Sequence, residues 1–217
     1  IICSIASMRV KSTFSKYSGM RNHMGLTGAQ AAERVLHGAG IYDVRIERVA
    51  GNLTDHYDPR NKVLRLSDAT YGQCSVAAVG VAAHECGHAI QHARGYAPLQ
   101  FRSALVPVAN FGSMIAWPLI VLGLFINSQS SALLINIGIL AFSLAVLFQL
   151  VTLPVEYNAS GRAVRILAET GMMQGEEIVA TKKVLNAAAL TYVASAAAAI
   201  LQLVRILILT GGRRRDD

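Results

Sequence analysis

The feature of this sequence that most restricts its fold is a long uncharged stretch. No Asp, Glu, Lys or Arg occurs between Ser103 and Val155, which is enough chain for two membrane-spanning helices of about 20 apolar residues each. Over the whole chain of 217 residues, 53% are hydrophobic and only 15% are charged, against a charged share of about 25% in typical soluble domains. The sequence therefore predicts an integral membrane protein.

We expect the two spanning helices at about residues 104–126 and 131–154, joined into a transmembrane hairpin (104–154) by the polar turn NSQS. A third membrane helix is expected at 187–210, followed by a basic tail at 211–217. This third segment is rich in alanine and contains Gln202 and Arg205, so it either spans the membrane or packs beside the other two. Residues 1–8 are apolar but too short to span, and we interpret them as the remnant of an N-terminal membrane helix.

Residues 9–103 form the polar part of the chain and are expected to be catalytic. Thr27 can cap a short helix that stops at Gly38 or Gly40, and YDVRIERV alternates as a half-buried strand does. GNLTDHYDPRNKVLRLS is typical of a hairpin with its turn at residues 58–61, and a helical pattern runs from Ser75 to about Ala93. The predicted fold is α+β and mostly helical, with a small sheet, two to three transmembrane helices and a zincin-like catalytic part.

The net charge of +7 does not indicate a nucleic-acid partner, because the basic residues are scattered and are not interleaved with aromatic ones. Cys3, Cys74 and Cys86 show no paired spacing, so neither a disulfide framework nor a cysteine zinc site is expected.

The helix VAAHECGHAIQH (81–92) carries the clearest chemical motif. His84 and His88 lie one turn apart on one face, so both imidazoles can bind one zinc ion, and Glu85 lies beside them. In this H-E-x-x-H arrangement the glutamate acts as general base toward a water molecule that attacks a carbonyl group.

A motif with three fixed positions also occurs by chance, but the apolar flanks would bury this helix, and buried histidines need the partners that a metal supplies. Gly87 would allow another backbone or a substrate to approach closely. His92 lies about 12 Å along the helix from His84 and cannot bind the same ion, so we interpret it as a solvent-side or interface residue.

The third ligand must come from elsewhere, and Glu156 is the first charged residue after the uncharged stretch. A membrane hairpin would return it to the face that carries His88, at the start of a new helical segment (155–186) marked by Pro154. Ser160 would then lie one turn later and could hydrogen-bond a ligand histidine. The alternative is that Glu156 only caps a helix N-terminus.

HECGH, the uncharged hairpin, VEYNASGRA and LTDHYDPRNKVLRLS together closely resemble the YugP-type neutral zinc metallopeptidases of bacterial membranes. More distantly the chain is similar to the HtpX and CAAX-prenyl endopeptidase group, in which an E-x-x-x-D motif supplies the third ligand. The resemblance implies one Zn²⁺ held by His84, His88 and Glu156, with Glu85 as catalyst. Ser160 departs from the aspartate of the distant group.

The resemblance also implies that an extended substrate pairs with the hairpin, where His56 would contact it. His56 and Asp58 could instead be ordinary turn residues. Tyr192 could donate a hydrogen bond to a developing oxyanion, or it could simply pack in a membrane helix.

The expected function is therefore a membrane-bound zinc metalloendopeptidase that cleaves membrane or membrane-adjacent proteins. Its expected partners are a protein or peptide substrate, the lipid bilayer and an accessory membrane protein not identified by the sequence. A zinc hydrolase of non-peptide amides or lipids would share every ligand, and a non-catalytic metal-binding scaffold would need the ligands but not Glu85.

Loop charges predict the orientation in the bacterial cell membrane. Residues 9–102 contain 12 Lys and Arg, residues 155–187 contain four, and NSQS contains none. By the positive-inside rule the catalytic face is cytoplasmic. The arginines of the tail disagree if the last segment spans.

Overall fold

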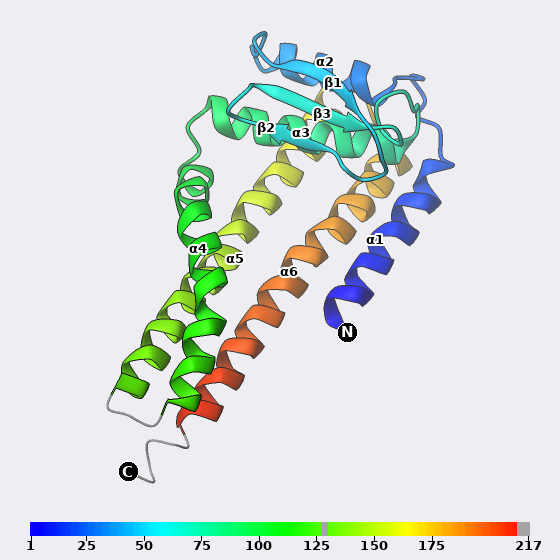
Figure 1. The fold of residues 1–217 in the computed structure, drawn as a ribbon. Helices are drawn as coiled ribbons and strands as arrows, with labels where there is room; N and C mark the ends of the chain where they lie inside the picture. The colour runs from blue at the N-terminus through cyan, green and yellow to red at the C-terminus, as the bar shows by residue number, and fades with distance from the viewer. Residues whose placement is uncertain (127–129, 212–217) are drawn as a thin grey trace. The chain divides into compact units, whose positions relative to one another are not determined.

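The computed structural model describes residues 1–126 and 130–211. It is mostly helical with one small sheet, which confirms the predicted α+β class, and it divides into two units. The first contains residues 3–96 and 155–191, and the second contains residues 97–154 and 192–211. In chain order the elements are α1 (Ile2–Ser18), α2 (Gly28–Gly38), β1 (Arg45–Val49), β2 (His56–Asp58), β3 (Val63–Ser67), α3 (Val76–Ala93), α4 (Ala97–Phe125), α5 (Ser130–Glu169) and α6 (Glu176–Gly211) (Figure 1).

Three helices, α4, α5 and α6, are long and apolar enough to cross a membrane. This agrees with the predicted number, but the helices are longer than the apolar stretches that define them. Pro154 lies inside α5 and does not start a new helix, because a proline removes a single backbone hydrogen bond and a long apolar helix can tolerate that loss. The NSQS turn and the tail fall mainly on residues 127–129 and 212–217, outside the described residues.

Side-chain caps fix where two helices of the first unit begin. The Thr27 hydroxyl accepts a hydrogen bond from the backbone of Gln30, whose side chain bonds back to the backbone of Thr27. Ser75 caps α3 in the same way by accepting from the backbone of Ala78. Such caps satisfy amide groups that the first helical turn leaves unpaired.

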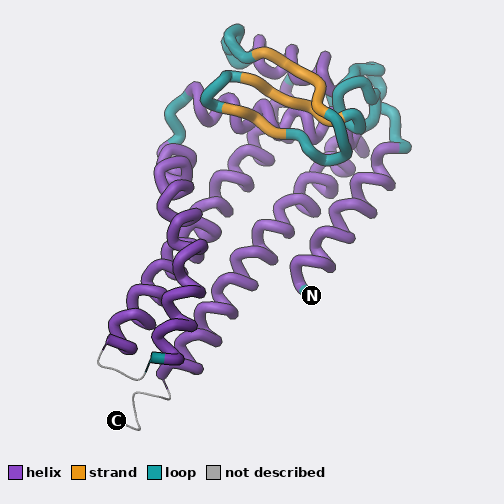
Figure 2. Tube along the Cα trace, viewed as in Figure 1, coloured by secondary structure: helices purple, strands orange, loops and turns teal. Residues whose placement is uncertain are grey.

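The sheet has the strand order β1-β3-β2 (Figure 2). β1 runs parallel to β3, and β2 runs antiparallel to β3, with which it forms the predicted hairpin. In the turn, the Asp58 carboxylate accepts hydrogen bonds from the side chain and backbone of Asn61 and from the backbone of Arg60. These bonds lower the pKa of Asp58 from 3.8 to about 2. β2 lies at an edge of the sheet, and the turn that follows it fixes its register against β3.

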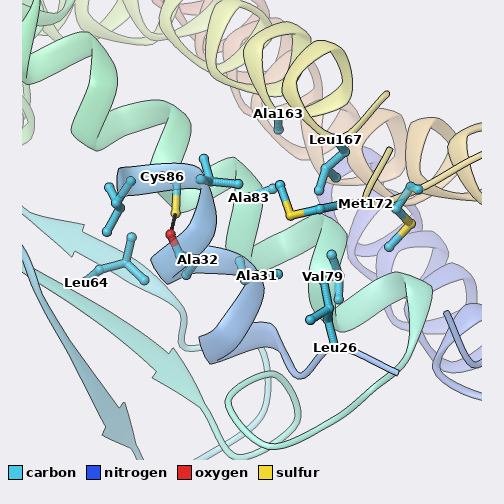
Figure 3. Close-up of a cluster of buried hydrophobic side chains, with 14 of the residues drawn as sticks. Leu26, Ala31, Ala32, Leu64, Val79, Ala83, Cys86, Ala163, Leu167 and Met172 are labelled. Carbon is cyan, nitrogen blue, oxygen red and sulfur yellow. Dashed lines mark hydrogen bonds between the residues drawn. The ribbon is translucent and has the colours of Figure 1, made fainter. Parts of the chain in front are cut away.

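The core of the first unit forms where α2 packs on α3. Strand β3 and the C-terminal part of α5 add further buried side chains to it. Small residues allow this close packing, and the buried Cys86 thiol donates a hydrogen bond to the carbonyl of Ala32 (Figure 3). The buried residues labelled in the same view are Leu26, Ala31, Ala32, Leu64, Val79, Ala83, Cys86, Ala163, Leu167 and Met172.

α3 and α5 approach closely at Gly87. A Cβ atom at this position would lie 2.6 Å from the carbonyl oxygen of Ala159, far inside ordinary van der Waals contact. The sequence predicted that Gly87 admits another backbone or a substrate, and the structure shows that it admits the backbone of α5.

We predict that Gly87→Ala destabilises the protein by about 1–3 kcal/mol, because the added methyl group meets backbone that cannot rotate away. The measurement is thermal unfolding of the detergent-solubilised protein. Gly161→Ala is the matched control, since a Cβ at Gly161 on α5 meets nothing within 4 Å and helical alanine is more stable than glycine. Equal unfolding temperatures for the two variants would contradict the close contact.

Candidate metal centre

Three side chains of the first unit converge on one point. His84 and His88 come from α3 and Glu156 from α5, and one nitrogen or oxygen of each lies within 4.8 Å of the others. Glu156 Oε2 is 3.3 Å from His84 Nε2 and 3.5 Å from His88 Nε2. The structure thus brings together the three residues that the sequence proposed as ligands.

The spacing of these atoms suits a tetrahedral metal ion. Ligand atoms bound at about 2.0–2.1 Å in a tetrahedron lie roughly 3.3–3.4 Å apart. Glu156 is 3% exposed, and its Oε2 has no hydrogen-bond partner among the described residues although two ring nitrogens are near. A buried, unpaired carboxylate oxygen is costly, and a cation placed between the three side chains removes that cost. Two imidazoles and one carboxylate also form a donor set that zinc uses.

A chain of hydrogen bonds determines which nitrogen of His88 faces this point. Arg162 can only donate, so its Nε bond of 2.7 Å identifies the Asn158 atom that it contacts as the amide oxygen. That oxygen also accepts from the Gln91 amide at 3.0 Å, and the same amide nitrogen donates to the carbonyl of Val155 at 2.8 Å.

The Gln91 amide oxygen must therefore face His88, whose Nδ1 lies 3.1 Å away. Since an amide oxygen can only accept, Nδ1 carries the proton and Nε2 keeps its lone pair for a metal. On the other histidine, Ser160 Oγ lies 3.1 Å from His84 Nδ1. This is the contact that the sequence predicted for Ser160 from its position one helical turn after Glu156. Both imidazoles are thus held through Nδ1 and present Nε2 to Glu156.

Glu85 is 9% exposed and makes no hydrogen bond to any residue that the structure describes. Burial works to lower the pKa of His88, but the neighbouring Glu156 and Glu85 outweigh it and raise that pKa above its ordinary value. Because a proton and a metal ion compete for Nε2, metal binding weakens toward acid pH.

The remaining predicted residues lie elsewhere. His56 begins β2, and its ring nitrogens contact the carbonyl of Thr54 at 2.9 Å and the Arg65 guanidinium at 3.5 Å, which fits the alternative of an ordinary turn residue. Tyr192 belongs to the second unit, so its role stays a prediction.

His92 is exposed, as expected, and its Nδ1 lies 2.9 Å from the Tyr57 hydroxyl. This contact places β2 beside the C-terminal half of α3. Burial, followed by the charges of Asp43 and Asp58, raises the pKa of Tyr57 to about 12, so its hydroxyl stays protonated and hydrogen-bonds His92 as a neutral group.

Sequence reasoning missed Gln91, Asn158 and Tyr57. Gln91 carried a weak signal, since it follows His88 by three residues on the same helix face and is polar within an apolar run. Asn158 and Tyr57 carried none, because their partners are distant in the sequence.

The fold and this site define a protein with three candidate membrane-spanning helices and a His-His-Glu group suited to zinc. The chain belongs to the family described as "Putative neutral zinc metallopeptidase", whose model matches residues 1–211. It is similar to "Putative membrane protease YugP" of Bacillus subtilis (strain 168), with 47% identity over 209 residues that cover 96% of this chain and 92% of that protein. No solved structure shows a significant match. The resemblance to the YugP-type zinc metallopeptidases that was drawn from the sequence is thereby confirmed.

We predict that Gln91→Leu weakens zinc binding by about 10–100-fold, because His88 loses the acceptor that fixes its tautomer and ring orientation. Zinc affinity of the purified protein, measured by competition with a fluorescent chelator, tests this. Gln100→Leu makes the same change at an exposed position of α4 and should bind zinc like the wild type. Unchanged affinity in Gln91→Leu would show that the hydrogen-bond chain does not orient His88.

Proposed function

We propose that this protein is a zinc-dependent metalloendopeptidase of the bacterial cell membrane that hydrolyses peptide bonds in membrane or membrane-adjacent proteins. The observation that carries the proposal is the convergence of His84, His88 and Glu156 beside a buried carboxylate, Glu85, that forms no hydrogen bond to any residue the structure describes. A metal site that only stabilised structure would have a fourth protein ligand and no need of such a base. The family to which the chain belongs supports the same class.

In the proposed reaction His84, His88 and Glu156 hold one Zn²⁺, and Ser160 and Gln91 keep the imidazoles in place. When bound, zinc acts as a Lewis acid that activates water and polarises the scissile carbonyl group. Glu85 accepts the proton of the attacking water and then donates it to the leaving amine nitrogen. Tyr192 is proposed as a donor to the developing oxyanion.

A peptide substrate is favoured over a lipid or another amide by the position of β2. This strand pairs with β3 on one side only, among the described strands, and the bond from Tyr57 to His92 places it next to the helix that carries His84 and His88. An extended peptide can add to such an edge through backbone hydrogen bonds, and His56 at the start of β2 would contact it.

We predict that Glu85→Gln binds one zinc ion per chain, as the wild type does, but loses protease activity by about 10²–10⁴-fold, because an amide cannot accept the proton. Both proteins are purified in detergent, their zinc is quantified, and cleavage of casein is followed. Chelation should abolish wild-type cleavage and added zinc should restore it.

Three results are informative here. Wild-type activity in Glu85→Gln would remove Glu85 from the mechanism. Zinc binding without cleavage by the wild type would favour the metal-binding scaffold or a non-peptide substrate. Absence of zinc from both proteins would overturn the central assignment.

The catalytic face is proposed to be cytoplasmic, since residues 9–102 contain 12 Lys and Arg and positively charged loops stay inside. A single cysteine placed at Arg45, after the native cysteines are replaced, should resist a membrane-impermeant thiol reagent in intact cells and react after lysis. A cysteine at Gln129 should react in intact cells, and the reverse pattern would invert the topology.

A further inference from the structure

An open pocket on the first unit is lined by four arginines. The pocket has a volume of about 350 Å³ and is lined by Arg34 of α2, Arg94 at the end of α3, and Arg162 and Arg165 of α5. These residues are up to 131 positions apart in the sequence, and only the packing of three helices brings them together.

The positive charge of this pocket is not neutralised from within. Glu169 is the one acidic residue in its lining, which leaves a formal charge of +3. The guanidinium groups of Arg34, Arg94 and Arg165 form no ion pair or hydrogen bond to any residue that the structure describes. Elsewhere on the same unit, exposed arginines do find carboxylates, as Arg48 does with Asp68 at 2.6 Å.

Arg162 is held in a defined orientation toward the pocket. Its Nε donates to Asn158 at 2.7 Å, and its guanidinium lies over the ring of Tyr96 at 5.9 Å from the ring centre. The terminal nitrogens of Arg162 therefore remain available to a ligand, with less side-chain entropy to lose than a free arginine would have.

The pocket is distinct from the metal centre. Each helical residue turns by about 100°, so Ile90, which lines the pocket, lies about 160° around α3 from His88. Arg165 lies about 180° around α5 from Glu156 by the same geometry. None of the three proposed metal ligands lines the pocket, although Arg162 is linked to His88 through Asn158 and Gln91.

We propose that this pocket, here named the arginine pocket, binds a ligand that carries a phosphate group. Guanidinium groups pair with phosphate in a bidentate manner, and a formal charge of +3 exceeds what one carboxylate would balance. The volume lies in the range of small-molecule sites, about 300–1,000 Å³, and the wall beside the arginines is apolar at Val35, Ile90 and Ile166. The phosphate can belong to an anionic phospholipid headgroup or to a soluble phosphate compound.

The test titrates the full chain, purified in dodecyl maltoside, with two probes in a calorimeter. One probe is inorganic pyrophosphate, and the other is phosphatidylglycerol in mixed micelles, with phosphatidylcholine micelles as the uncharged reference. The pocket variant is Arg34→Gln/Arg165→Gln, which spares Arg162 and its link to His88. The control variant, Lys182→Gln/Lys183→Gln, removes the same charge from exposed positions of the same unit.

We expect saturable binding of at least one probe to the wild type and to the control variant, and affinity at least about tenfold lower in the pocket variant. Binding of pyrophosphate alone identifies a soluble phosphate ligand, and binding of phosphatidylglycerol identifies the lipid. Equal losses in the two variants would reduce the effect to overall charge and overturn the proposal, as would the absence of saturable binding to the wild type.

A second measurement needs no variant. Phenylglyoxal modifies accessible arginines, and the bound probe should protect Arg34, Arg94 and Arg165 more than Arg45 and Arg48, which lie on the sheet. Mass spectrometry reads the modification at each site. Equal protection at the pocket and on the sheet would overturn the proposal.

Discussion

The contact between Gly87 and Ala159 is the constraint on which the metal centre depends. His84, His88 and Gln91 flank Gly87 on α3, and the residues that meet them flank Ala159 on α5. A Cβ atom added at Gly87 would lie only 2.6 Å from the carbonyl oxygen of Ala159, so any larger residue there would push the two helices apart. Glu156 Oε2, which lies 3.3 Å from His84 Nε2 and 3.5 Å from His88 Nε2, would then be too far from both nitrogens to share one ion with them.

The same pair of helices carries polar groups in a largely apolar interior, and each of these groups constrains the next. Arg162 orients Asn158, Asn158 orients Gln91, and Gln91 fixes the tautomer of His88. In a buried site such a chain is stable only when every member is satisfied. Oε2 of Glu156, which has no hydrogen-bond partner among the described residues, lies near both ring nitrogens, where a cation would be bound.

Several features followed from local sequence because they depend on neighbouring residues. The cap at Thr27, the turn after Asp58 and the one-turn spacing of His84 and His88 required no tertiary information. The prediction that Pro154 begins a helix was wrong, because local propensity favours a break there and the packing of a long helix overrides it. Glu156 was reached by combining a charge pattern with the geometry of a hairpin.

By itself, the sequence determined the mostly helical α+β class, the three apolar helices and the zinc-type motif, since periodicity and charge distribution are local properties. Only the tertiary structure decided that Gly87 admits α5, that Gln91 orients His88, and that four arginines from three helices line one pocket. Those contacts join residues far apart in the chain. Their formation depends on how close two backbones can approach and on which polar groups must be satisfied once water is excluded.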